Sequence, residues 1–165
     1  MHIFGRESMG DLSEMGGKMK QPVLTEEEIT MVRENVEQNL VRVADANPGT
    51  TFYLFLPPYS IAAWGMFYGE GNVLRYIEAQ EIAAGMLTAC DNVRLYSFST
   101  DTDIVCDFDN YADRTHFTEE INSMILREMA KEDSRYRLTE DDTEAYLAEM
   151  KELYLQFDYS SLANE

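Results

Sequence analysis

Two nearly uninterrupted apolar segments constrain the fold of this chain more than any other feature. The first is "TTFYLFLPPYS", residues 50–60, and the second is "VRLYSFS", residues 93–99. Both are rich in aromatic and branched side chains, and such runs are typical of strands that are covered on both faces. Pro57 and Pro58 end the first strand, because each proline removes a backbone donor.

A helical segment separates these two strands. It is "NVLRYIEAQEIAAGMLTAC", residues 72–90. The order strand, helix, strand within residues 50–99 indicates a βαβ unit, in which the two strands are parallel. The sequence therefore predicts an α/β fold.

An earlier helix is predicted in "TEEEITMVRENVEQNLVRVADANPG", residues 25–49. Thr25 is placed as its N-cap, and Glu28 can reach back to complete a capping box. The segment "NPG", residues 47–49, ends it. Its apolar positions recur at helical spacing, and they are Ile29, Val32, Val36, Leu40 and Val43.

Two further helices are predicted in the C-terminal part of the chain. One is "TEEINSMILREMAK", residues 118–131, capped by Thr118, and the other begins after Thr139. Residues 1–22 show no sustained period and are predicted to be a loose lead-in. The predicted organisation is thus a lead-in (1–22), an α/β domain (23–133) and an appended amphipathic helix (134–165).

Charge and cysteine content limit the partners that we expect. The chain of 165 residues carries 31 acidic and 13 basic side chains, a net charge of −18, which argues against binding to nucleic acid or to an anionic membrane surface. Cys90 and Cys106 have neither metal-ligand nor disulfide-framework spacing. No apolar run approaches the roughly 20 residues of a spanning helix, and residues 1–21 lack the apolar centre of a signal peptide. We expect no metal site and no membrane segment.

The stretch "DNYADRTHFTEEIN", residues 109–122, contains the best candidates for chemistry. Asp113 and His116 lie three residues apart, after the second strand and before a helix. That is the edge of an open α/β sheet where functional groups gather. The carboxylate can hold one imidazole nitrogen while the other acts as the general base for a serine hydroxyl. The alternative is a histidine that only caps or packs at a helix start.

The wider sequence resembles a known family. The segments "NPGTTFYLFLPPYSIAAW", "DNVRLYSFSTDTDIVCDFDNYADRTHFTEEINSMIL" and "RYRLTEDDTEAYL" are similar to the C-terminal half of SGNH/GDSL-type hydrolases, especially uncharacterised bacterial surface-associated members. The resemblance covers residues 25–165. It implies a flavodoxin-like three-layer α/β fold that acts on ester bonds, often acyl groups on carbohydrate, without metal or cofactor. Asp113 and His116 match the acid and base of the family's Ser-His-Asp triad.

The sequence departs from this family at the nucleophile. The family's serine follows the first strand in a G-D-S block, and its oxyanion donors come from two later blocks. Here "GDLS", residues 10–13, follows no apolar strand, so neither Ser13 nor Ser8 is expected to be the nucleophile. We therefore expect the chain to be the C-terminal part of a longer protein and inactive alone.

Residues that follow the first strand are predicted to bind substrate. Tyr59, Ser60 and Trp64 come directly after it, and loops at that end of a sheet form the site. For Ser60, turn formation after Pro58 is the favoured alternative. The expected substrate of the completed protein is an acylated carbohydrate or another small ester.

Two parallel strands alone would leave an unpaired edge on a strand whose apolar character is typical of an internal one. We expect an N-terminal half, a second copy of the chain in a homodimer, or the lead-in folded back as a strand to cover it.

The function predicted for the chain is that of an esterase or acyltransferase fragment. The alternative is a non-catalytic interaction module or dimeric scaffold with relics of a triad, so enzyme activity stays open. Full-length relatives commonly carry an N-terminal anchor or export signal, which implies a surface or extracytoplasmic location for them.

Overall fold

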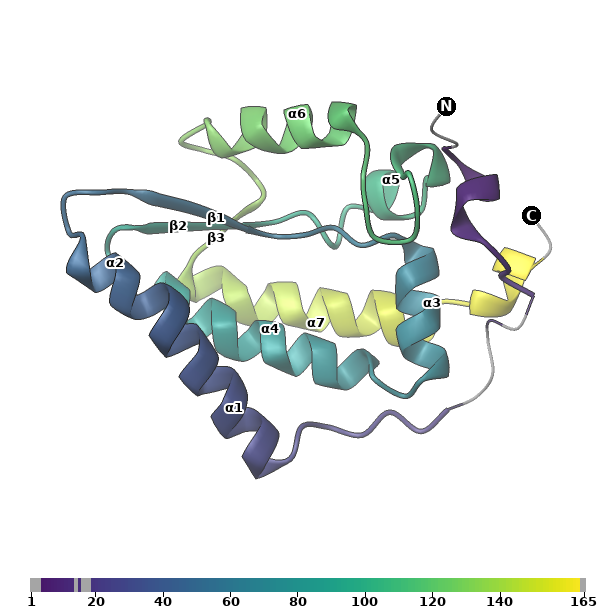
Figure 1. Ribbon diagram of the computed structural model, residues 1–165, viewed down its shortest axis with the longest axis horizontal. Helices are drawn as coiled ribbons and strands as arrows, with labels where there is room; N and C mark the ends of the chain where they lie inside the picture. Colours follow the sequence, from purple (N-terminus) through teal and green to yellow (C-terminus); the bar gives the residue numbers. More distant parts are fainter. Residues whose placement is uncertain (1–3, 14, 16–18, 164–165) are drawn as a thin grey trace.

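A small mixed sheet forms the centre of the computed structural model, which describes residues 4–13, 15 and 19–163 (Figure 1). Its strands β1 (Phe52–Leu56), β2 (Val93–Ser97) and β3 (Arg137–Leu138) lie in that order. β1 and β2 are parallel, with Phe52 opposite Val93, and β3 is antiparallel to β2. The predicted α/β class and the parallel pair are confirmed, whereas β3 was not predicted.

Helices make up most of the remaining described chain. The α-helices are α1 (Glu26–Val36), α2 (Arg42–Ala46), α3 (Ile61–Gly69), α4 (Val73–Thr88), α5 (Thr102–Val105), α6 (Glu119–Met129) and α7 (Glu140–Gln156). Short 3₁₀ helices are η1 (Arg6–Met9), η3 (Phe108–Asn110) and η4 (Tyr159–Ala163), and η2 (Glu37–Val41) is a π-helical turn. The predicted capping box of Thr25 and Glu28 is present, and Thr118 caps α6 as expected.

The π-helical turn η2 changes which side of the first helix is buried. α1, η2 and α2 follow one another without a break, but a π turn takes up extra residues and so rotates the face that follows it. Ala44 is buried, whereas Leu40 and Val43 are 37% and 44% exposed. The regular spacing in the sequence had placed Leu40 and Val43 on the same apolar stripe as Val36.

Helices cover both faces of the sheet. In Figure 1, α6 lies on one side of the strands, and α4 and α7 lie on the other. Tyr96 and Phe98 pack with Ile125 of α6 in one buried cluster. Leu95 and Leu138 point to the opposite face and belong to the larger cluster that α4 and α7 help to form. The strands thus lie in the middle of three layers.

α7 is part of this core. The sequence predicted residues 134–165 to be an appended helix, but α7 packs beside α4. Met150 and Tyr154 on α7 have no exposed surface. The C-terminal segment therefore fills one of the two helical layers.

The described part of the N-terminal segment is also packed, although its sequence predicted a loose lead-in. Met9 and Leu12 are each 1% exposed. The Arg6 side chain donates to the backbone carbonyl of Leu162, at 2.9 Å, and thereby joins the two ends of the described chain. Burial of two apolar side chains holds the segment in place, and no periodic pattern in the sequence indicates these contacts.

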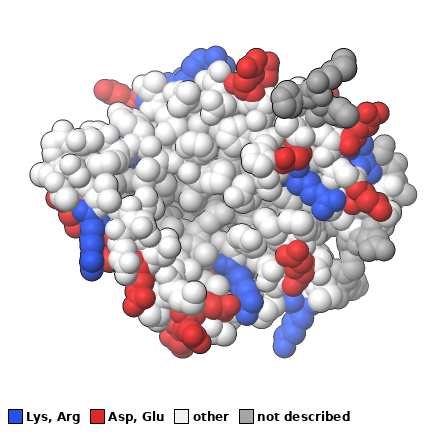
Figure 2. Space-filling model, in the orientation of Figure 1, with Lys and Arg blue, Asp and Glu red and all other residues white. Residues whose placement is uncertain are grey.

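One edge of β1 has no strand partner among the described residues. Residues 4–13 form η1 and turns beside α3 and η4, so this part of the lead-in does not cover the edge. The sheet is seen nearly edge-on in Figure 1, with β1 nearest the reader. Figure 2 shows the same face of the molecule: charged side chains gather along its upper and lower edges and on the right side, and its middle is mostly uncharged. Tyr53 of β1 is 54% exposed.

Candidate functional site

The loop that carries Asp113 and His116 is a short hairpin between η3 and α6. An antiparallel bridge joins Tyr111 to Phe117, and the Ala112 N–H donates to the His116 carbonyl at 2.8 Å. α6 begins directly after this hairpin. The loop is therefore closed at its base, and the residues between have a defined backbone path.

Asp113 organises the interior of this loop. Its Oδ1 accepts hydrogen bonds from the backbone N–H groups of Thr115 and His116, each at 2.8 Å. Its Oδ2 lies 2.7 Å from His116 Nδ1. Partial burial tends to raise the pKa of Asp113, but these hydrogen bonds outweigh it and lower the pKa to about 2. The carboxylate is ionised at neutral pH.

His116 presents its imidazole to solvent. The side chain is 79% exposed, and the ring is held at Nδ1. A carboxylate on Nδ1 favours the neutral tautomer that carries its proton on that nitrogen. Nε2 is then an unprotonated acceptor that faces outward, as a general base requires.

A shallow, mainly apolar pocket of about 350 Å³ adjoins the imidazole. It is lined by Pro57, Tyr59, Thr115, His116 and Phe117. Pro57 and Tyr59 follow the carboxyl end of β1. Tyr59 and His116 thus line the same pocket, and the role of Tyr59 in substrate binding stays a prediction. Thr115 was not singled out from the sequence, although it lies beside His116 in the same loop.

Ser60 does not line this pocket. Its side chain is completely buried, and its Oγ caps α3 by accepting from the Ala63 N–H at 3.3 Å. The same hydroxyl donates to the Arg114 carbonyl at 2.7 Å. The predicted substrate contact of Ser60 is therefore corrected to a structural role at the turn, which was the alternative.

Trp64 lies in the core. It is 1% exposed, and its ring stacks on Tyr154 of α7, with ring centroids 3.9 Å apart. The sequence predicted a loop after Pro58 in which Trp64 would line a cleft. Instead α3 begins at Ile61 and turns this face of the helix toward α7. Its predicted role in substrate binding is corrected for that reason.

No serine lines the pocket among the described residues. Ser8 donates to the Gly5 carbonyl at 2.7 Å, and Ser13 lies in an exposed turn after Asp11. The site therefore presents a candidate base and its carboxylate without a serine beside them. The Thr115 hydroxyl is close by and donates to Asp113 Oδ1 at 3.2 Å.

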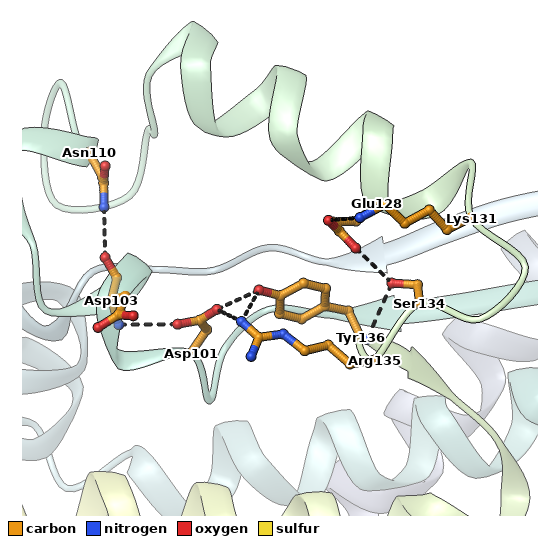
Figure 3. Close-up of polar contacts among 8 residues, drawn as sticks. All are labelled: Asp101, Asp103, Asn110, Glu128, Lys131, Ser134, Arg135 and Tyr136. Carbon is orange, nitrogen blue, oxygen red and sulfur yellow. Dashed lines mark hydrogen bonds and ion pairs between the residues drawn. The ribbon is translucent and has the colours of Figure 1, made fainter.

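A second polar cluster surrounds Asp101, at the end of β2. Figure 3 shows the Tyr136 hydroxyl and the Arg135 guanidinium facing the same oxygen of this carboxylate, and they donate to it at 2.5 and 2.8 Å. Burial and the bond to Asp101 raise the pKa of Tyr136. The cluster borders a polar cavity of about 750 Å³ and was missed from the sequence. Because its charged groups are already paired, it fastens the turn after β2 to the segment before β3.

Comparison of the chain with known proteins finds no matching family model, no similar curated protein and no similar solved structure. The resemblance to SGNH/GDSL-type hydrolases thus stays a prediction. Among the helices of the described residues, none has the length and apolar character to span a membrane.

We expect Asp113→Asn to alter how stability depends on pH. The pKa of Asp113 lies at about 2 in the fold, below its ordinary value of 3.8. Its ionised form therefore stabilises the fold above about pH 4, and this contribution is lost as the pH falls through 2. Because the side chain is half exposed, solvent screening limits the effect to about 1 kcal/mol or less. Urea unfolding should show a difference between wild type and variant at pH 7 that shrinks toward pH 2. A constant difference would contradict this assignment.

Proposed function

We propose that this chain supplies the general base and the orienting carboxylate of an SGNH-type serine esterase or acyltransferase site. The observation that carries the proposal is the 2.7 Å contact between His116 Nδ1 and Asp113 Oδ2. It leaves the other ring nitrogen accessible beside a pocket at the carboxyl end of a parallel strand. The same side chains in this arrangement form two parts of a Ser-His-Asp triad.

The proposed chemistry follows from the tautomer. His116 Nε2 takes the proton of a serine hydroxyl as the serine oxygen attacks an ester carbonyl, and it later returns that proton to the leaving alcohol. The imidazolium formed in between is stabilised by the ionised Asp113, whose pKa of about 2 keeps it charged. The two residues thus act as one unit.

The nucleophile is proposed to come from a polypeptide segment that adds a parallel strand to β1. Three observations support this. The pocket lacks a serine, the "FYLFL" strand is apolar on both faces but unpaired on one edge, and the face around that edge is poor in charge (Figure 2). Leu40, Val43 and Tyr53 add exposed apolar surface. A parallel strand at this edge would end on the same side as His116 and bring its following turn toward the imidazole.

The pocket supports a small ester as substrate. Pro57, Tyr59 and Phe117 give it apolar walls, and its volume of about 350 Å³ suits a short acyl group or one sugar ring. An aromatic ring beside the base can pack against either of them. We therefore propose an acylated carbohydrate or a similar small ester.

The tautomer of His116 provides the experiment. In ¹⁵N-labelled protein at a pH where the imidazole is neutral, the ring shifts should report a proton on Nδ1. Asp113→Asn should move the population toward the Nε2–H form, because an amide N–H can donate to an unprotonated Nδ1. The chain has two histidines, so His2→Gln assigns the signals. A wild-type imidazole that is mainly protonated on Nε2 would overturn the proposed base.

A dimeric scaffold is the second candidate, and the open β1 edge favours it as well. Two copies could pair their β1 strands and bury Tyr53. The net charge of −18 on each copy opposes this association. Sedimentation at physiological salt separates the two: a stable dimer supports the scaffold, and a cooperatively folded monomer contradicts it.

A further inference from the structure

Arg114 stands between Asp113 and His116 in the sequence, and its backbone and side chain are both held by hydrogen bonds to other segments. We propose that it is the positioning residue of the His116–Asp113 pair, and that residues 5–12 act on the site through it. The role of Arg114 in catalysis rests on the proposed function. The contacts that support its positioning role are different from the Asp113–His116 contact.

The backbone of Arg114 is anchored to α3. Its carbonyl accepts two hydrogen bonds from Ser60, one from the backbone N–H at 3.2 Å and one from Oγ at 2.7 Å. Ser60 is itself fixed, because it caps α3 and is completely buried. The peptide unit between Asp113 and His116 is therefore tied to the rigid start of a helix.

The side chain of Arg114 binds the N-terminal segment. Its Nε donates to the Met9 carbonyl at 2.7 Å, and its Nη2 donates to the Asp11 carbonyl at 2.8 Å. Gly10 lies between these acceptors with a φ of 72°, a conformation that favours glycine. The planar guanidinium can reach two acceptors at once with fixed geometry. The side chains of Met9 and Leu12 are buried and hold residues 5–12 against the rest of the fold.

The same segment also holds the base of the loop. The Tyr111 carbonyl accepts from the Gly5 N–H at 3.3 Å, and Ser8 Oγ lies at the same distance from it. The Tyr111 hydroxyl donates to the Pro58 carbonyl at 2.8 Å. Residues 5–12 thus contact the loop at its base through Tyr111 and at its tip through Arg114.

These contacts explain how an exposed imidazole can have a fixed position. The His116 side chain is 79% exposed, so little packing restrains the ring itself. Its orientation depends on the backbone of residues 113–116, which Asp113 organises from inside and Arg114 from outside. The side-chain bonds of Arg114 go to backbone carbonyls and not to the imidazole. We infer that it acts through geometry.

Arg114→Met tests the inference, because it keeps an apolar stem of similar length and removes the guanidinium donors. The readouts are hydrogen exchange at the Thr115 and His116 amides, which donate to Asp113 Oδ1, and the ¹⁵N tautomer of His116. We expect about tenfold faster exchange at both amides. We also expect a mixed tautomer in place of a single form.

Arg94→Met is the matched control. Arg94 Nη1 also donates to two backbone carbonyls, those of Asp91 and Val93, at 2.8 and 2.9 Å. These lie at the opposite end of β2 from the loop. This control should leave the amide exchange of the loop and the His116 tautomer at wild-type values.

Wild-type exchange and tautomer in Arg114→Met would overturn the inference. Exchange at Leu95 in the centre of β2 reports on global unfolding. If Arg114→Met unfolds the chain, Arg114→Lys decides: one ammonium can serve one of the two carbonyls, so intermediate exchange supports the inference and wild-type exchange rejects it. A wild-type ring protonated on Nε2 would overturn the proposed function alone, since the exchange rates would still test the positioning.

Discussion

Trp64→Ala should lower the free energy of unfolding by about 3–5 kcal/mol, the usual cost of removing a large aromatic side chain from a core. Trp64 is 1% exposed, stacks on Tyr154 and meets Phe67 edge-on at 5.6 Å between ring centroids. Alanine would leave a cavity between α3 and α7, and the buried Tyr154 ring would lose its stacking partner. Urea unfolding monitored by circular dichroism measures the effect.

Two further variants make this test specific. Tyr53→Ala removes an aromatic ring that is 54% exposed, so a loss of about 1 kcal/mol or less is expected. Trp64→Phe keeps a ring at the site and removes an indole N–H that has no partner among the described residues, so its cost should fall well below that of alanine. A loss under about 1 kcal/mol for Trp64→Ala would instead favour the surface role that the sequence predicted.

The largest effect on activity is expected for His116→Ala in a polypeptide completed by the strand and serine that the proposed function requires. We expect this change to reduce the hydrolysis of p-nitrophenyl acetate by about 10⁴-fold or more, because the base and the serine act as a unit. Asp113→Asn should cost a similar factor by favouring the wrong tautomer. The chain of 165 residues should show no turnover beyond that of an accessible imidazole.

The experiment extends the coding sequence upstream of Met1 and compares four proteins. They are the extended wild type, His116→Ala, Asp113→Asn, and His2→Ala as a matched histidine control that should keep full activity. Full activity in His116→Ala would overturn the assignment of the base. An inactive extended wild type would favour the non-catalytic interaction module.

Local signals in the sequence predicted a substantial part of the fold. The Thr25–Glu28 capping box involves side chains three residues apart, and it is present. The parallel pairing of β1 and β2 follows from two buried-type runs joined by a helix, and it is also present. The capping box joins residues close in sequence, and the parallel pair belongs to consecutive elements of one βαβ unit, so pattern and spacing can describe both.

Contacts between distant residues were not predictable in this way. β3 has two residues, too few to produce an alternating pattern, and it pairs because the segment after α6 returns the chain to the sheet. The exposure of Leu40 follows from the π-helical turn, which disrupts a regular 3.6-residue period. Burial of Met9 depends on residues more than fifty positions away, such as Ser60.

In the candidate site too, local contacts were predictable from the sequence and contacts between distant residues were not. The contact of Asp113 with His116 was predictable because three residues of a tight loop bring the side chains together. Ser60 and Trp64 follow a strand end, as substrate-binding residues often do, but α3 and α7 bury them. The hydrogen bond from Arg114 Nε to the Met9 carbonyl joins residues 105 positions apart, and no spacing rule indicates it.

The open edge of β1 also bears on the colloidal behaviour of this protein. "FYLFL" contains no proline, glycine or charge, and such a segment on an exposed edge can template cross-β stacking between copies. Lysine and proline, which often guard edge strands, are absent from β1 itself. Mutual repulsion from the net charge of −18 is then the main barrier to fibril growth. This barrier weakens in concentrated salt and near the isoelectric point of about 4.3, so neutral, dilute buffers are the conditions in which the chain should stay dispersed.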